Sequence, residues 1–103
     1  MCCNDHFRFS KYTVGEEFKR HRDGVNQDSN GFRAKYTVNI FLNDDFEGGS
    51  TEFFNESGTS IFDAVPAVGR GMIFDGQIIH CGNKVTKGVK YLLRTDVMVR
   101  DGL

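Results

Sequence analysis

Two long segments with alternating side chains constrain the fold of this chain more than any other feature. Residues 33–43 have the sequence RAKYTVNIFLN. Every second residue from Ala34 to Leu42 faces one way, and every second residue from Lys35 to Phe41 faces the other way. In residues 89–100, VKYLLRTDVMVR, a largely apolar set alternates with a set that contains basic residues. A period of two is typical of a β-strand. Both segments are therefore predicted to be long strands with two different faces.

Six shorter segments also have the composition of strands, and they are residues 7–12, 17–23, 50–54, 59–64, 71–75 and 78–82. Breaks rich in Gly, Asn or Asp, such as NDDFEGG and NESGT, separate them. No stretch of ten residues has the periodicity of a helix. Eight strands at this spacing predict an all-β fold with little or no helix, built as a jelly-roll-like double sheet.

The length, charge and composition of the chain limit the classes of partner and the cellular location that we expect. With 103 residues we expect one domain, residues 1–103, and the formal charge of -1 creates no field that would recruit nucleic acid or an anionic membrane. No apolar run approaches the ~20 residues of a membrane span, and the first residues lack the order of a signal peptide. Three cysteines form no disulfide framework. We therefore expect a cytoplasmic protein with neither nucleic acid nor membrane as a partner.

Two histidines and one aspartate have a spacing that suits a metal site. His21 and Asp23 in the segment HRD are two residues apart, and residues i and i+2 of a strand project from the same face. His80 in IIHCG offers a third ligand, and two imidazoles with one carboxylate form the facial set that suits Fe(II) and leaves open positions. The alternative is a solvated His–Asp pair with an unrelated histidine, and these three residues alone do not exclude it.

Two basic residues share one face of the last predicted strand. Lys90 follows His80 by ten residues, and Arg94 lies two pleats further on. If the apolar face of this strand is the outer one, Lys90 and Arg94 point inward; the alternative places both in solvent. A buried cation requires an anion, and a dicarboxylate that chelates the metal through one end would bring its far carboxylate to Lys90.

Three motifs together resemble the prolyl 4-hydroxylase-like Fe(II)/2-oxoglutarate-dependent dioxygenases. FSKYTVGEEFKRHRDG is similar to their R-Y-x-x-G-x-x-Y/F-x-x-H-x-D segment, and TVNIFLNDDFEGGSTEFF to their T-x-x-x-Y-L-N…GG-x-T-x-F hairpin. VPAVGRGMIFDGQIIHCGNKVTKGVKYLLRTDVMVR is similar to their P-x-x-G-x-x-x-x-F…H…V-T-K-G-x-K/R-Y block. The three motifs cover nearly the whole chain in the same order, which is more specific than any one of them.

The resemblance implies a fold, a reaction and a set of roles. The fold is a double-stranded β-helix of the cupin-like kind. The reaction hydroxylates a C–H bond, and 2-oxoglutarate is decarboxylated to succinate and CO2. The expected substrate is a prolyl or lysyl side chain in a peptide or protein, and the alternative is a small molecule. His21, Asp23 and His80 match the iron ligands, Lys90 matches the residue that binds the far carboxylate of 2-oxoglutarate, and Tyr12 matches a tyrosine that assists it. O2 is the other co-substrate, and ascorbate is a candidate reductant.

Two positions depart from the family pattern. Phe41 stands where several relatives carry a tyrosine, so one hydrogen bond to the co-substrate is either missing or supplied by Asn39. Arg94 matches no ligand common to the family, and it either helps to neutralise the co-substrate or pairs with Asp96 or another acidic neighbour.

Several alternatives stay open at this point. The chain can also be a catalytically silent metal-binding module or a truncated regulatory or interaction domain. Relatives usually carry N-terminal helices over the larger sheet, and the apolar outer face expected here predicts either a longer protein or a homo-oligomer. The polar segment of residues 24–32 is either a lid over the substrate entrance or a plain surface loop.

Overall fold

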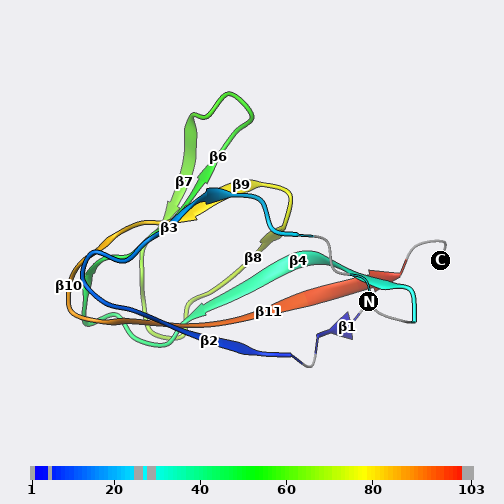
Figure 1. Cartoon of the computed structure of the whole chain (residues 1–103), viewed down its shortest axis with the longest axis horizontal. Coiled ribbons are helices and arrows are strands. Elements are labelled where there is room, and N and C mark those ends of the chain that lie inside the picture. The colour runs from blue at the N-terminus through cyan, green and yellow to red at the C-terminus, as the bar shows by residue number, and fades with distance from the viewer. Residues whose placement is uncertain (1, 5, 25–26, 28–29, 101–103) are drawn as a thin grey trace.

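The computed structural model describes residues 2–4, 6–24, 27 and 30–100. Within these residues the chain forms strands and turns, and none of the described segments is a helix that could cross a membrane. Two antiparallel sheets face each other, and the hairpin of β6 and β7, at one edge of the smaller sheet, projects away from the larger sheet (Figure 1). The all-β double sheet expected from the sequence is confirmed.

The larger sheet has the order β1-β11-β4-β8, and β2 also pairs with β11. Its strands are β1 (Cys2–Cys3), β2 (Arg8–Tyr12), β4 (Phe32–Phe41), β8 (Gly71–Asp75) and β11 (Lys90–Arg100). The smaller sheet has the order β3-β9-β6-β7, with β3 (Phe18–His21), β6 (Thr51–Phe54), β7 (Ser60–Ala64) and β9 (Ile79–Gly82). A separate pair joins β5 (Glu47–Gly48) to β10 (Val85–Lys87). Strands that follow one another in the chain thus often lie in different sheets, as in a jelly roll.

The two alternating segments form the centre of the larger sheet. They correspond to β4 and β11, which pair antiparallel along almost their whole length. Thr37, Asn39 and Phe41 of β4 are buried, as are Lys90 and Leu92 of β11. Of the two directions that the sequence left open for Lys90, the structure shows the inward one, and Lys90 lies inside the double sheet.

An apolar cluster and a group of buried polar side chains share the space between the sheets. The apolar cluster consists of Phe41, Phe53, Ala64, Met72 and Leu92. The buried polar and charged side chains are Asp23, Thr37, Asn39, Thr51, His80, Lys90 and Thr95. Burial of polar groups is costly unless they are paired, so such a concentration marks the part of the interior where a functional site belongs.

The outer face of the larger sheet exposes apolar side chains, as the alternation predicted. Phe9 of β2 is 77% exposed and Ile73 of β8 is 69% exposed. They pair with Leu93 and Val38 respectively, which lie on the same outer face. The expectation that a longer chain or a second copy covers this face stays a prediction.

Residues 25, 26, 28 and 29 lie outside the described residues, so the choice between a lid and a loop at residues 24–32 also stays open.

Candidate metal centre and co-substrate pocket

His21 and His80 come together because β3 and β9 are neighbouring strands. The two residues are directly opposite each other in the antiparallel pairing, and their ring centroids are 4.3 Å apart. His21 Nδ1 lies 2.6 Å from the carbonyl oxygen of Lys19, and His80 Nδ1 lies 2.9 Å from that of Ile78. A carbonyl oxygen only accepts, so Nδ1 carries the proton in both rings. In the neutral rings the Nε2 lone pairs are thereby free to bind a metal.

Asp23 completes the cluster, although it follows β3 rather than lying on it. Its Oδ1 is 3.3 Å from His21 Nε2 and 3.4 Å from His80 Nε2, and the three candidate ligand atoms lie within 4.8 Å of one another. Its backbone N–H donates to the carbonyl oxygen of Gly76 over 2.7 Å, and Gln77 Nε2 donates to its carbonyl oxygen over 3.0 Å. These bonds to the turn between β8 and β9 fix Asp23 where the predicted strand 17–23 has already ended.

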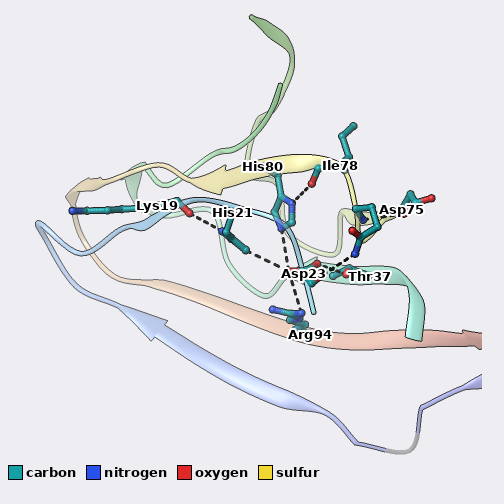
Figure 2. Close-up of polar contacts among 9 residues, drawn as sticks. Lys19, His21, Asp23, Thr37, Asp75, Ile78, His80 and Arg94 are labelled. Atoms are coloured by element: carbon teal, nitrogen blue, oxygen red, sulfur yellow. Dashed lines mark hydrogen bonds and ion pairs between the residues drawn. The ribbon is translucent and has the colours of Figure 1, made fainter. Parts of the chain in front are cut away.

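Groups from the larger sheet hold the Asp23 carboxylate from the other side. The hydroxyl of Thr37 donates to Oδ2, and Arg94 Nη2 lies 3.3 Å from Oδ1. Figure 2 shows Arg94 reaching from β11 toward Asp23 while His21 and His80 come from the smaller sheet. Burial opposes ionisation, but the contacts with His80 and Thr37 and the charge of Arg94 outweigh it and lower the pKa of Asp23 to about 2. The side chain is a carboxylate at neutral pH, the form that binds metal.

A cavity of about 140 Å³ extends from His21 and His80 to Lys90. Lys90 is 2% exposed, and its Nζ lies 5.0 Å from the ring centre of Tyr12 and 5.6 Å from that of Phe41. Burial lowers the pKa of Lys90 to about 8. Within the described part of the chain no carboxylate forms an ion pair with Lys90. The cavity therefore contains a buried cation that no carboxylate of the described residues neutralises.

The walls of this cavity fit a bound dicarboxylate. Asn39 Oδ1 is buried without a hydrogen-bond partner, and rotation of the amide would replace this oxygen by an NH2 group that can donate to a carboxylate. Gly82 leaves room beside the lysine, because a Cβ there would lie 3.7 Å from Lys90 Nζ. Burial raises the pKa of Tyr12, so its hydroxyl keeps its proton and can donate. Metal donors at one end and a lysine at the other match an anion that chelates through one end.

The structure brings all the residues singled out in the sequence into one region. Tyr12 and Lys90 are cross-strand partners, as are Asn39 and Arg94, and all four line the cavity. Arg94 pairs with Asp23 rather than with Asp96. Sequence reasoning missed that Thr37 binds Asp23, and it missed Gln77 altogether. Both contacts join segments that are far apart in the chain, and no local pattern signals them.

A comparison with family models identifies the family of the chain. The model described as the 2OG-Fe(II) oxygenase superfamily matches residues 7–95, which include every residue of the cluster and the cavity named above. No curated protein matches the sequence significantly.

Solved structures with the same fold include three oxygenases. A 2OG-Fe(II) oxygenase family oxidoreductase from Burkholderia pseudomallei has a TM-score of 0.74 at 15% identity, over 87% of this chain and 40% of that one. A Pseudomonas putida prolyl-4-hydroxylase has a TM-score of 0.72 at 22% identity, over 91% and 52%. The viral collagen prolyl hydroxylase of Paramecium bursaria Chlorella virus 1, solved with 2OG, has a TM-score of 0.65 at 19% identity, over 94% and 63%.

At these identities the structural likeness establishes the fold alone. The chain spans only 40% to 63% of the length of these three proteins. The family assignment comes from the match over residues 7–95, and the cluster of two histidines and one aspartate agrees with it. The protein belongs to the 2OG-Fe(II) oxygenase superfamily.

Proposed function

We propose that residues 1–103 form the catalytic core of an Fe(II)- and 2-oxoglutarate-dependent dioxygenase that hydroxylates a C–H bond of its substrate. One observation carries this proposal: three metal-ligand atoms within 4.8 Å of one another adjoin a cavity that ends at a buried lysine with no carboxylate partner among the described residues. In the balanced reaction, substrate, 2-oxoglutarate and O2 give hydroxylated substrate, succinate and CO2. One atom of O2 ends in succinate and the other in the new hydroxyl group, while CO2 derives from the carboxylate that 2-oxoglutarate loses.

In this proposal His21, Asp23 and His80 bind Fe(II). The chemistry supplied by the bound ion is the oxidative decarboxylation of 2-oxoglutarate by O2, linked to oxygen insertion into the C–H bond. The protein contributes a preformed donor set, because backbone carbonyls orient both imidazoles and Thr37 orients the carboxylate. Ordering these ligands before the ion binds reduces the entropy that binding would otherwise cost.

Lys90 and Tyr12 are proposed to bind the far carboxylate of 2-oxoglutarate. The buried ammonium group of Lys90 would gain a charge-assisted hydrogen bond, which offsets the unfavourable burial of its charge. Asn39 would donate through its amide where Phe41 has no hydroxyl to offer. We also propose that Arg94 contributes positive charge to this site, since its guanidinium lies beside the Asp23 carboxylate.

The proposed substrate is a prolyl or lysyl side chain of a peptide or protein, or a small molecule that presents a similar group. Its support is the similarity of the motifs to prolyl 4-hydroxylase-like enzymes and the shared fold with the two prolyl hydroxylases named above. Ascorbate is proposed only as a reductant that maintains Fe(II) during turnover.

Succinate formation tests the proposed reaction most simply. Purified protein is incubated in air with Fe(II) and 2-oxoglutarate, with and without a set of short prolyl and lysyl peptides, and succinate is quantified by mass spectrometry. We expect a slow Fe(II)-dependent formation of succinate without peptide, and a faster one with a suitable peptide that gains one oxygen atom. The matched variants are Asp23→Asn, which removes a proposed ligand charge, and Asp63→Asn, which makes the same change at an exposed position on β7.

The alternative of a silent metal-binding module predicts a different outcome. Such a module would bind Fe(II) through the same three residues but would form no succinate above the level of the Asp23→Asn variant under any condition. Equal succinate formation by the wild type and Asp23→Asn would contradict the proposed function.

A further inference from the structure

Two arginines face each other beside the metal cluster. Arg8 of β2 and Arg94 of β11 are direct partners in the antiparallel pairing, so their side chains project from the same face of the sheet. Like charges at directly opposite positions destabilise a sheet. Arg94 offsets part of this repulsion through Asp23, but Arg8 forms no ion pair or hydrogen bond with any described residue. Such a pair is more stable when an anion lies between its members.

These arginines stand where two cavities meet. Both line the co-substrate cavity, and both also line a second, polar cavity of about 260 Å³. The other residues that line the second cavity are Asn4, His6, Thr95 and Asp96. A molecule in the second cavity would therefore lie against Arg8 and Arg94 and close to the metal cluster, where the reacting C–H bond of a substrate has to be placed.

The charges of the co-substrate cavity exceed what 2-oxoglutarate neutralises. Arg8, Lys90 and Arg94 line it, and no aspartate or glutamate among the described residues does. In the proposed function, Lys90 binds the far carboxylate of 2-oxoglutarate, and the near carboxylate binds the metal. A guanidinium group has five N–H donors, and Arg94 uses one nitrogen toward Asp23. Among the described residues, no partner takes up the remaining donors of Arg94 or any donor of Arg8, so they can bind a third anionic group.

We propose that Arg94 and Arg8 bind a carboxylate group of the substrate, so that the enzyme selects substrates with a carboxylate close to the C–H bond that is hydroxylated. The carboxylate can belong to a free acid, such as an amino acid, or to an acidic side chain of a peptide. Arginine suits this role because its planar donor pairs match both oxygens of a carboxylate. This inference rests on the proposed function and names its substrate class.

Asp96 is the one carboxylate among the described residues that line the second cavity. It forms no ion pair with Arg8 or Arg94 in the structure, although it lies two residues from Arg94 on the same strand. Its position on the far side of the arginines from Lys90 would repel a carboxylate that entered too deeply into the second cavity, and so would favour one held at the arginines.

Binding of matched neutral and anionic probes tests this inference. The protein is loaded anaerobically with Fe(II) and 2-oxoglutarate, and the weak visible band of the chelate reports that both are bound. N-acetyl-L-proline is then compared with N-acetyl-L-prolinamide, and acetyl-Asp-Pro-Gly-amide with acetyl-Asn-Pro-Gly-amide, by calorimetry and by the shift of the band. Each pair differs in one carboxylate, and the two pairs distinguish a free acid from an acidic side chain.

We expect at least one carboxylate probe to bind about ten-fold or more tightly than its amide, as for a hydrogen bond to a charged group. In Arg8→Gln this ratio should fall toward one while the band remains, and in Arg94→Gln the ratio should also fall, with the band recorded alongside because Arg94 contacts Asp23. Arg8→Gln keeps the test valid if Arg94→Gln also weakens the chelate, because Arg8 has no contact with Asp23.

Two results would overturn the inference. One is equal binding of the anionic and neutral members of both pairs to wild-type protein that shows the band. The other is a carboxylate preference that survives in both arginine variants. In either case the band shows that the metal and co-substrate sites are intact, so the proposed function stands. Absence of the band from folded wild-type protein would instead contradict the proposed function itself.

Discussion

His21 and His80 face each other across neighbouring antiparallel strands, and the Nε2 atoms of both lie within 3.4 Å of the same oxygen of Asp23. Each imidazole is oriented by a backbone carbonyl two residues before it in the chain. The geometry of the cluster is thus determined by strand pairing and backbone hydrogen bonds, which exist before any ion binds. This preorganisation leads to measurable expectations for the metal, the co-substrate and the residues that support them.

Metal binding should stabilise the fold. An ion that binds only the folded state adds about 2.7 kcal/mol to the free energy of unfolding at a concentration of 100 Kd. For a domain of this size each kcal/mol raises Tm by roughly 4–8 °C. We expect such a rise when Fe(II) or Mn(II) is added to metal-free protein under argon, measured by circular dichroism. The same rise in His21→Ala would show that the stabilising ion binds elsewhere.

Thr37→Val should weaken metal binding without abolishing it. The hydroxyl of Thr37 donates to Asp23 Oδ2, and loss of a bond that orients a metal ligand typically lowers metal affinity about 10–100-fold. Thr37→Ser retains a hydroxyl and serves as the matched control. Calorimetric titration with Mn(II) compares the three proteins. If Thr37→Val binds Mn(II) as tightly as Thr37→Ser does, the hydroxyl has no part in holding the carboxylate.

The affinity for 2-oxoglutarate should fall as the pH rises above about 8. Burial lowers the pKa of Lys90 to about 8, so the empty cavity holds an ammonium group below this pH and a neutral amine above it. The dicarboxylate binds the protonated form, and its affinity is therefore fully present below pH 8 and decreases by up to about ten-fold per pH unit above it.

This pH dependence is measurable with metal-loaded protein at pH 7 and pH 9 under argon. The matched variant is Lys90→Met, which keeps much of the side-chain volume and removes the charge. It should bind 2-oxoglutarate weakly at both values of pH. A wild-type affinity that is the same at pH 7 and pH 9 would contradict the assignment of Lys90 as the partner of the far carboxylate.

Gly82→Ala should separate co-substrate binding from metal binding. A Cβ at Gly82 would lie 3.4 Å from Phe18 Cβ and 3.7 Å from Lys90 Nζ, which are ordinary contact distances. The variant should therefore fold and bind Mn(II), but its methyl group occupies space beside Lys90 and should weaken 2-oxoglutarate binding. Gly71→Ala, whose Cβ would come no closer than 3.8 Å to Ile40 on the larger sheet, is the control. Equal affinities for 2-oxoglutarate in the two variants would place the co-substrate elsewhere.

The sequence was sufficient to predict the fold because the strands have strong local patterns. The alternation in residues 33–43 and 89–100 corresponds closely to β4 and β11, and it separated Lys90 from the apolar face of β11, although it left open whether Lys90 points inward. The short strands β1, β5 and β10 were not predicted, since segments of two or three residues have no detectable period and depend on pairing with distant strands.

The sequence identified which residues form the candidate site, but it did not predict the contacts between them. The motif HRD indicated that His21 and Asp23 would act together, yet Asp23 lies beyond the end of β3 and is positioned by Gly76 and Gln77. An acidic partner was one of the alternatives for Arg94, but the sequence did not identify it as Asp23. These contacts depend on the separation of the two sheets and on the path of a turn, and neither is encoded in a local pattern of residues.

The visible absorption of the anaerobic protein with Fe(II) and 2-oxoglutarate tests the central claim most directly. Metal-free wild type, His80→Ala and Asp63→Asn are titrated with both components, after circular dichroism has shown that each protein is folded. The proposed site predicts a weak charge-transfer band of chelated 2-oxoglutarate in the wild type and in Asp63→Asn, and no band in His80→Ala. No band in the folded wild type, or an equal band in His80→Ala, would contradict the assignment of this cluster as the site where iron and 2-oxoglutarate bind.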